Sequence, residues 1–252
     1  MGVTDYKAVR NTVDIVILAA ENKNEDNIRK VPSKQLQVML VKRNQEPFKG
    51  TWVLPGGFVD YEIGLSEAVS KKLIQKTGIS NIYTEQLYTY GDNVNRDPRD
   101  RVITVAYIAL VNKNKLININ KENDCDFETA WFWVNTERSE NGQVVNVGLE
   151  RVEGMCAEEI TTGFDHKNII IDAINRMANK IMYTDIGFNL VDKEFTIKEL
   201  QTAYECVIGK QIAGFRRLIE NKVKETNKTT YDIKDKPDSY RPAKLYYKVG
   251  LG

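Results

Sequence analysis

The sequence predicts an α+β fold in two parts, a mixed sheet with a helix packed on it, followed by a smaller helical part that ends in a hairpin. Three observations lead to this prediction. Apolar runs of strand length recur as far as residue 134, and a glycine-rich turn among them leads into a helix. From Phe164 onward, apolar residues recur at helical spacing instead. We therefore expect a domain boundary near Gly163, between residues 1–163 and residues 164–252.

The length of 252 residues allows one large domain or two ordinary ones, and a hydrophobic content of 42% is sufficient for packed cores. No run approaches the roughly 20 apolar residues that a membrane helix needs, and the first residues lack the apolar segment of a signal peptide. The cysteines form no C-x2-C pair, so they indicate neither a zinc site nor a disulfide framework. We expect a cytoplasmic protein that does not contact a membrane.

Strands are predicted in the first part where apolar residues run together or alternate with polar ones. These segments are residues 12–20, 36–43, 51–54, 82–90, 102–111, 115–119 and 129–134. A mixed sheet covered by a helix fits this order of elements. Residues 135–163 are polar and poorly periodic, so we expect a connection there, with a short helix near residues 157–160.

The stretch over residues 52–79 contains the clearest local signals in the chain. The Pro-Gly-Gly run at residues 55–57 ends a short strand, because proline lacks a backbone donor and glycine tolerates positive φ. A helix is predicted to begin near Leu65, with Ser66 as its N-cap, and to end at Gly78. The unit is a strand, a glycine loop and a helix with a glycine stop.

This unit resembles the Nudix box, the loop and helix that hold magnesium and pyrophosphate in Nudix hydrolases, with the pattern G-x5-E-x7-R-E-U-x-E-E-x-G-U, where U is apolar. Counted from Gly57, the positions that match are Leu73, Gly78 and Ile79. The positions that depart from it are Ile63 at the first Glu, Lys71-Lys72 at the Arg-Glu pair and Gln75-Lys76 at the Glu-Glu pair. A lysine ammonium is only a donor and cannot bind Mg²⁺, which needs oxygen ligands. We therefore expect no catalytic residue, no metal site and no cofactor, with Mg²⁺ needed only if the chain is a hydrolase after all.

The last third predicts a winged helix-turn-helix. Its elements are a long amphipathic helix at residues 165–183, helices at 197–208 and 211–222, and strand-like runs at 229–233 and 243–249. Thr196 and Glu199 have the spacing of a capping box at the start of the second of these helices. From Phe195 to the C-terminus, 12 basic and 7 acidic residues give a net charge of +5, against +1 for the whole chain. This asymmetry indicates contact with phosphate.

The two parts together resemble one family, the NrtR-like transcriptional regulators, which are Nudix-related repressors of NAD metabolism. The segments that carry the likeness are LQVMLVKR at 36–43, EPFKG at 46–50, LPGGFV at 54–59, RDPR at 96–99, RVI at 101–103, FDH at 164–166, FT at 195–196, ELQ at 199–201, YE at 204–205, FRR at 215–217 and RPAKLY at 241–246. The resemblance implies an α/β/α Nudix sandwich and a homodimer that binds operator DNA. It also implies that the Nudix domain senses a ligand, typically ADP-ribose and in some relatives a sugar, whose binding releases DNA.

Candidate ligand residues follow from the chemistry of a pyrophosphate. Arg43, Arg99 and Arg101 can pair with its charge, and Gly56 and Gly57 allow the backbone to approach it. Phe58 or Tyr90 can stack on an adenine, although aromatic residues on strands more often belong to a core. The only histidine, His166, has no partner set for a metal or a triad, and we expect a role between the domains rather than in catalysis.

Candidate DNA-binding residues lie on the second helix of the winged helix and on its hairpin. They are Arg216, Arg217, Lys222, Lys224, Arg241 and Lys244. Arginine forks match both phosphate oxygens and guanine edges, so the two arginines are the first candidates.

Two other functions stay open at this point. A Nudix hydrolase that cleaves ADP-ribose or a related nucleotide with Mg²⁺ needs a metal site from Glu62, Glu67 or acids elsewhere. A metabolite-binding module whose winged helix contacts protein is the third interpretation, and salt-sensitive binding to duplex DNA would count against it.

Overall fold

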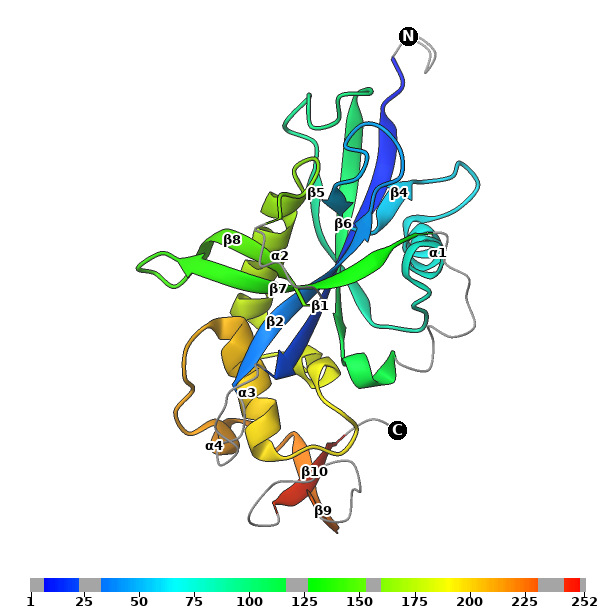
Figure 1. Ribbon diagram of the computed structural model, residues 1–252. Coiled ribbons are helices and arrows are strands. Elements are labelled where there is room, and N and C mark those ends of the chain that lie inside the picture. The colour runs from blue at the N-terminus through cyan, green and yellow to red at the C-terminus, as the bar shows by residue number, and fades with distance from the viewer. Residues whose placement is uncertain (1–6, 23–32, 117–126, 153–159, 231–242, 250–252) are drawn as a thin grey trace.

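The computed structural model describes residues 7–22, 33–116, 127–152, 160–230 and 243–249. Within them, a mixed sheet is covered by helix α1 (Leu65–Thr77) on one side and by helix α2 (His166–Lys180) on the other, as Figure 1 shows. The winged helix elements lie at one end of this sheet, and the N-terminus lies at the opposite end. The predicted α+β class, with an α/β/α sandwich before a winged helix, is confirmed.

The sheet has the strand order β5-β6-β1-β2-β7-β8. The strands on this path are β1 (Arg10–Asn22), β2 (Lys34–Lys42), β5 (Thr84–Tyr90), β6 (Val102–Val111), β7 (Thr129–Arg138) and β8 (Val144–Arg151). Two short strands pair beside it, β3 (Trp52–Val53) with β2 and β4 (Gly56–Phe58) with β1. Strand β1 runs parallel to β6 and antiparallel to β2, so the sheet is mixed. Strand β1 is buried from Thr12 to Ala20, because helices cover both faces of the sheet.

The prediction of a connection over residues 135–163 is wrong at residues 135–138 and 144–151, which belong to strands. Strand β7 extends to Arg138 and pairs antiparallel with β8. The buried residues of β8 are Val144, Val147 and Leu149. Their unequal spacing, together with a register shift next to Arg138, hides the alternation that identifies a strand. The helix expected near residues 157–160 falls almost entirely outside the described residues. Most of the strand expected at residues 115–119 does so as well, and its first residue belongs to the 3-10 helix η2 (Lys113–Lys115).

Glycines set both ends of α1. Its N-cap is Gly64, with no side-chain capping bond, so the prediction of Ser66 as N-cap is wrong. Ser66 lies inside the helix, where its carbonyl accepts a hydrogen bond from the Ser70 hydroxyl at 3.1 Å. At the other end Gly78 adopts a left-handed φ of 71°, and its N–H donates to the Ile74 carbonyl at 2.9 Å, as predicted.

The helical part of the C-terminal region consists of η3 (Ile186–Leu190), α3 (Ile197–Ile208) and α4 (Phe215–Ile219). Helix α3 has the predicted capping box, in which Thr196 and Glu199 each accept a hydrogen bond from the backbone N–H of the other. Helix α4 is shorter than the predicted span of residues 211–222, because Gly214 takes a left-handed φ of 66° immediately before it.

The wing is the hairpin of β9 (Val223–Thr229) and β10 (Lys244–Lys248). Its first strand begins at Val223 rather than at residue 229 as predicted, because pairing with β10 places Val223 opposite Lys248. Phe195 forms a further antiparallel bridge with Tyr246, with backbone hydrogen bonds of 3.0 and 2.8 Å in the two directions. This bridge ties the start of α3 to the wing.

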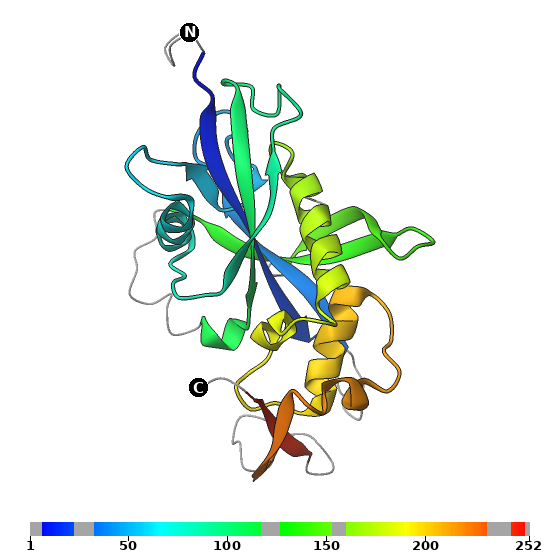
Figure 2. The same cartoon turned by 180° about the vertical axis from the view of Figure 1, so that it is seen from behind.

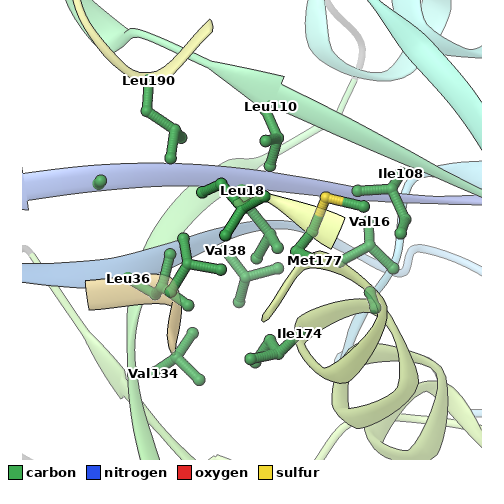
Figure 3. Packing of buried hydrophobic residues seen from close by; sticks show 14 of the residues in the cluster. Val16, Leu18, Leu36, Val38, Ile108, Leu110, Val134, Ile174, Met177 and Leu190 are labelled. Carbon is green, nitrogen blue, oxygen red and sulfur yellow. The ribbon is translucent and has the colours of Figure 1, made fainter. Parts of the chain in front are cut away.

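Two apolar clusters hold these layers together. The smaller one lies between the sheet and α1 and includes Leu73. The larger one covers the opposite face and runs from Val38 of the sheet through Ile174 and Met177 of α2 (Figure 3) to Leu200 of α3. Figure 2 shows α2 lying along the sheet and reaching α3, which also packs on β2. The winged helix thus shares a core with the sheet, and the boundary near Gly163 stays a prediction.

Among the described residues, no helix combines the length and apolar character that crossing a membrane requires.

Candidate functional site

A cavity of about 340 Å³ lies beside α1. Its wall is formed by the start of β1, the end of β2, the turn through β3 and β4, the loop before β6 and the residues that begin α2. The sheet brings these distant segments together, because β1 pairs with β2, β4 and β6. The predicted ligand residues that line the cavity are Arg43, Gly56, Gly57, Phe58 and Arg99.

Gly56 lies so close to β1 that no side chain fits at this position. A Cβ atom built on Gly56 would lie 2.3 Å from the Val13 carbonyl oxygen and 2.6 Å from Oδ1 of Asp14. A Cβ atom on Gly57 would lie 3.4 Å from Cε of Lys72, because that side chain crosses the turn. The glycines therefore bring the main chain to the cavity wall, as predicted.

A buried polar cluster closes one side of the cavity. Arg96 donates two hydrogen bonds to Asp165, at 2.9 and 2.7 Å, and its Nη2 lies 3.6 Å from Oδ2 of Asp14. Although burial disfavours the charged guanidinium, the bonds to Asp165 and the charge of Asp14 hold the pKa of Arg96 above its usual range. Since Asp165 is the N-cap of α2, this cluster connects the cavity wall to the start of that helix.

His166 is buried in the same cluster and is neutral. Its Nδ1 accepts a hydrogen bond from the backbone N–H of Leu54 at 2.9 Å, so the proton of the neutral ring lies on Nε2. Nε2 is 3.7 Å from Oδ1 of Asp14. Burial lowers the pKa of His166, and the nearby carboxylates only partly oppose that effect. The expectation of a joining role fits this position, because the ring fixes the start of α2 to the turn at Leu54.

Arginine side chains and aromatic rings form the part of the wall next to this cluster, where the Phe164 and His166 rings lie 5.2 Å apart. The guanidinium carbon of Arg99 lies 5.0 Å from the centre of the Phe58 ring and 5.7 Å from that of Phe164. Arg43 lies 5.2 Å from the Phe164 ring and donates to the carbonyls of residues 46 and 47. Asp97 accepts two hydrogen bonds from the Arg99 side chain, and although burial opposes its charged form, these bonds hold the pKa of Asp97 below its usual range. This wall suits a ligand that combines a flat ring with negative charge.

The face of α1 that lines the cavity carries Lys72, Gln75 and Lys76. The three acids that line the cavity already have basic partners: Asp14 lies beside Arg96, Asp60 pairs with Lys71, and Asp97 pairs with Arg99. Glu62 and Glu67 are exposed and do not line the cavity. No group of three or more His, Cys, Asp or Glu side chains that could hold a metal ion occurs in the described part of the chain. The residues present therefore do not fit the Mg²⁺ of a Nudix box.

Two residues considered for the ligand lie elsewhere. Arg101 is not among the cavity-lining residues, and its guanidinium donates to the carbonyl of Gly91 at 2.6 Å. The hydroxyl of Tyr90 donates to Asp172 of α2 at 2.8 Å, so this ring belongs to the other face of the sheet. The structure does not bring either residue into the group formed by Arg43, Phe58 and Arg99.

Sequence reasoning assigned no ligand role to several residues that line the cavity, and these are Asp14, Lys72, Lys76, Arg96, Phe164 and His166. Their chain positions gave no local signal of a shared site, since Leu54 and His166 are 112 residues apart and meet only in the fold. The structure itself marks one of them, since Phe164 has a left-handed backbone with φ 57°, which is uncommon for a residue other than glycine.

A second candidate site lies on the winged helix. Arg216 and Arg217 are exposed on α4, whose Phe215 and Ile219 are buried and fix the helix to the core. Nη2 of Arg216 lies 3.2 Å from the Tyr246 hydroxyl, which places the arginine against the wing. Lys224 on β9 and Lys244 on β10 are also exposed, and Lys244 pairs with Glu225 at 2.5 Å. The structure thus brings Arg216 and Lys244 into one group through Tyr246 and Glu225, while Arg217 and Lys224 are exposed on α4 and β9.

Two predicted DNA contacts stand apart from this group. Lys222 is half-buried and pairs with Asp185 at 3.2 Å, and the side-chain bonds of Lys222 and Lys248 hold the pKa of Asp185 below its usual range despite some burial. The charge of Lys222 is therefore partly neutralised within the protein. Arg241 lies outside the described residues.

Comparison with known families finds a match for each of the two parts of the chain. The family model of the Nudix domain matches residues 16–145, and that of the NrtR DNA-binding winged helix domain matches residues 187–247. Among curated proteins, the chain is 34% identical over 249 residues to the ADPR responsive transcriptional repressor NtrR of Acinetobacter baylyi, a match that covers 96% of this chain and 83% of the relative.

Two solved structures resemble the whole chain. One is NrtR of Shewanella oneidensis complexed with a 27mer DNA, at 31% identity and a TM-score of 0.66, covering 94% of this chain and 92% of that chain. The other is a MutT/nudix family protein from Enterococcus faecalis, at 25% identity and a TM-score of 0.71, covering 98% of this chain and 89% of that chain.

Proposed function

We infer the function of this chain from the family to which it belongs, the NrtR-like regulators, which join a Nudix domain to a DNA-binding winged helix. We propose that it is a transcriptional repressor that binds operator DNA and is released by ADP-ribose or a similar metabolite. We expect it to act in the cytoplasm, on genes of NAD, nicotinate or sugar metabolism.

One observation supports this proposal above the others: α2 begins in the wall of the cavity and ends against the winged helix. His166 and the Phe164 ring belong to the cavity wall. Ile174 and Met177 of the same helix pack in the cluster that contains Leu200 of α3. A change at the cavity therefore has a continuous packed route to the DNA-binding part.

ADP-ribose fits the chemistry of the cavity. Its lining has six basic and three acidic side chains, a net of +3 with His166 neutral, which favours a diphosphate. The rings of Phe58 and Phe164 offer apolar faces to a base or a sugar. The relative from Acinetobacter baylyi is described as ADPR responsive, which supports the same effector.

Release of DNA requires the effector to distinguish two arrangements of the protein. We propose that the chain is a homodimer whose two winged helices reach two operator half-sites in one arrangement and not in the other. A ligand shifts this equilibrium only by the difference between its affinities for the two arrangements. The start of α2, tied to Arg96 and Leu54, is the part that we expect to move when the cavity fills.

We propose further that the Nudix domain binds its ligand without hydrolysing it. The carboxylates of the Nudix box are replaced by isoleucine, lysine and glutamine, and the remaining acids of the cavity are paired. Hydrolysis is the alternative function, and release of AMP from ADP-ribose with Mg²⁺ would identify it.

The test is a fluorescence anisotropy titration of the full chain with DNA from upstream of its own gene, with and without ADP-ribose. Selective binding that ADP-ribose weakens is the expected result. Selective binding that ADP-ribose does not change would show that ADP-ribose is not the effector, while the role as a DNA-binding regulator would still be supported. Equal binding to operator and unrelated DNA, together with AMP release, would contradict the repressor and favour the hydrolase.

A further inference from the structure

The side of α1 that faces the cavity carries cations where a Nudix hydrolase carries the ligands of its metal. Lys72 and Lys76 occupy two of those box positions, and both line the cavity. They are half-buried, whereas the neighbouring Lys71 is exposed and lies outside the cavity lining. Two ammonium groups have therefore replaced two carboxylates at the same place in the fold.

Neither ammonium group has a carboxylate partner within 4.0 Å among the described residues, although other basic groups nearby do. Lys71 pairs with Asp60 at 2.9 Å, and Lys42 pairs with Glu128 at 3.0 Å. Lys76 instead lies 3.3 Å from the centre of the Phe127 ring, and Lys72 crosses Gly57. The protein supplies other lysines of this region with counter-ions and leaves these two facing the cavity.

The positive charges also form a continuous group. Burial, then the charges of Lys72 and Arg43, lower the pKa of Lys76, and burial, then the charge of Arg99, lowers the pKa of Arg43. Each of these cations therefore raises the free energy of the next. An anion that bridges them relieves this repulsion, as Mg²⁺ relieves repulsion between carboxylates and phosphate in a hydrolase.

We propose that Lys72 and Lys76 form a metal-free diphosphate site, in which the two ammonium groups hold the ligand directly and take the place of the divalent cation. This inference deepens the proposed function, on which it rests, because it assigns how the same cavity holds its effector. Arg43 completes the site from the end of β2. The ligand class is a small molecule with a diphosphate, and binding needs no metal.

Calorimetric titration with inorganic pyrophosphate and with ADP-ribose, first in EDTA and then in Mg²⁺, tests this proposal on the full chain. We expect both ligands to bind in EDTA. Mg²⁺ should leave the affinity unchanged or lower it, since the metal neutralises the free ligand that the lysines would otherwise attract. The double variant K72M/K76M should bind at least about tenfold more weakly, because charge-assisted bonds to phosphate are lost.

The matched control is K49M, which removes the same charge from an exposed lysine outside the cavity lining, and its affinity should match that of the parent. A further variant, K72E/Q75E/K76E, restores carboxylates to three box positions and should bind pyrophosphate only when Mg²⁺ is present. Circular dichroism and thermal unfolding identify any variant that fails to fold.

Three results would overturn the proposal: binding that requires Mg²⁺ in the parent, parent-like affinity of K72M/K76M, or no binding of pyrophosphate in EDTA. The proposed function fails separately. If pyrophosphate binds through the lysines but ADP-ribose does not bind, the diphosphate site is supported and ADP-ribose is rejected as the effector. If ADP-ribose releases DNA equally from the parent and from K72M/K76M, the repressor function is supported and the diphosphate site at the two lysines is rejected.

Discussion

The ligand cavity and the DNA-binding surface both gather positive charge, but they hold it in different ways. In the cavity, Arg96 and Arg99 are fixed by paired hydrogen bonds to Asp165 and Asp97. On the winged helix, Arg216 is exposed on a helix of five residues and is held by one hydrogen bond to the Tyr246 hydroxyl. Fixed groups suit a small ligand of one shape, whereas exposed arginines can adapt to phosphates and base edges.

This difference predicts different responses to salt. Binding to DNA releases counter-ions for each phosphate that is contacted, so its affinity falls steeply as salt rises. Charges within a partly buried cavity are screened much less. Salt therefore separates the two sites experimentally, and variants that loosen the cavity or neutralise the surface act on only one of them.

The largest expected effect comes from breaking the fixed cluster with D165N. Asp165 holds Arg96, whose side chain is only 4% exposed, and its removal leaves this buried charge with Asp14, at 3.6 Å, as its remaining carboxylate in the cluster. We expect the free energy of unfolding to fall by about 3 kcal/mol or more, measured by urea denaturation. Release of DNA by ADP-ribose should weaken as well, because Asp165 begins α2.

The control is D100N, which makes the same chemical change at an exposed pair with Arg10. Its stability should stay close to that of the parent. Equal losses in the two variants would mean that the cavity cluster is no more fixed than the surface.

The next effect tests the surface, by replacement of both arginines in R216A/R217A. Loss of a base-reading arginine costs about 1–3 kcal/mol, so we expect specific operator affinity to fall at least about 30-fold for the pair. ADP-ribose binding and thermal unfolding should not change, because both side chains are exposed. The matched variant K7A/R10A removes two charges near the N-terminus, at the opposite end of the molecule (Figure 1), and operator binding like that of the parent is expected. Normal operator binding by R216A/R217A would refute the assignment of α4 as the reading helix.

The two sites also differ in how much of them the sequence predicted. Local signals fixed α1 and α3, where Gly78 and the capping box of Thr196 act within one turn of chain. The length of α4 was mispredicted, because the predicted helix ran through Gly214, which takes a left-handed turn, and the helix begins only after it. Strand β8 was missed, because the bulge at Arg138 breaks its alternation.

Within the cavity, sequence motifs led to some of the lining residues, but others in the same motifs, such as Arg96, were missed, as were residues that arrive only by folding. Gly56 and Gly57 stand in the glycine loop, and Arg99 is in the RDPR segment. Asp14 looks like an ordinary polar residue inside a buried strand, and its role follows only once β1 brings it beside Arg96 and His166. The sequence showed that the lysines of α1 cannot bind a metal. Their ability to bind an anion could be inferred only from the cavity that they face.

A smaller effect sharpens the contrast through pH. His166 is the only histidine, and its pKa is lowered by burial, so the folded protein takes up a proton less readily than the unfolded chain. Its contribution to stability is present above the unfolded pKa and is lost as the pH falls below about 6.5. We expect the free energy of unfolding to decrease as the pH falls below about 6.5, by at most about 1.4 kcal/mol per pH unit for one proton.

Urea denaturation across this range measures the effect, and H166Q should remove most of the slope, since glutamine does not titrate. A slope that survives in H166Q would assign the pH dependence to other groups. Operator affinity of the refolded parent at pH 7 serves as the control that the transition is reversible.

The smallest effect separates two lysines that lie two residues apart on the wing side. Lys224 is exposed, whereas Lys222 is half-buried and paired with Asp185. If Lys224 meets a phosphate, K224A should reduce the slope of log affinity against log salt by about 1, uniformly across DNA sequences. K222A should change that slope less, because Asp185 already neutralises part of its charge, and should lower the unfolding temperature slightly through loss of the pair. An equal decrease of slope in the two variants would show that Lys222 leaves Asp185 to bind DNA, and that the surface adapts on binding while the cavity stays fixed.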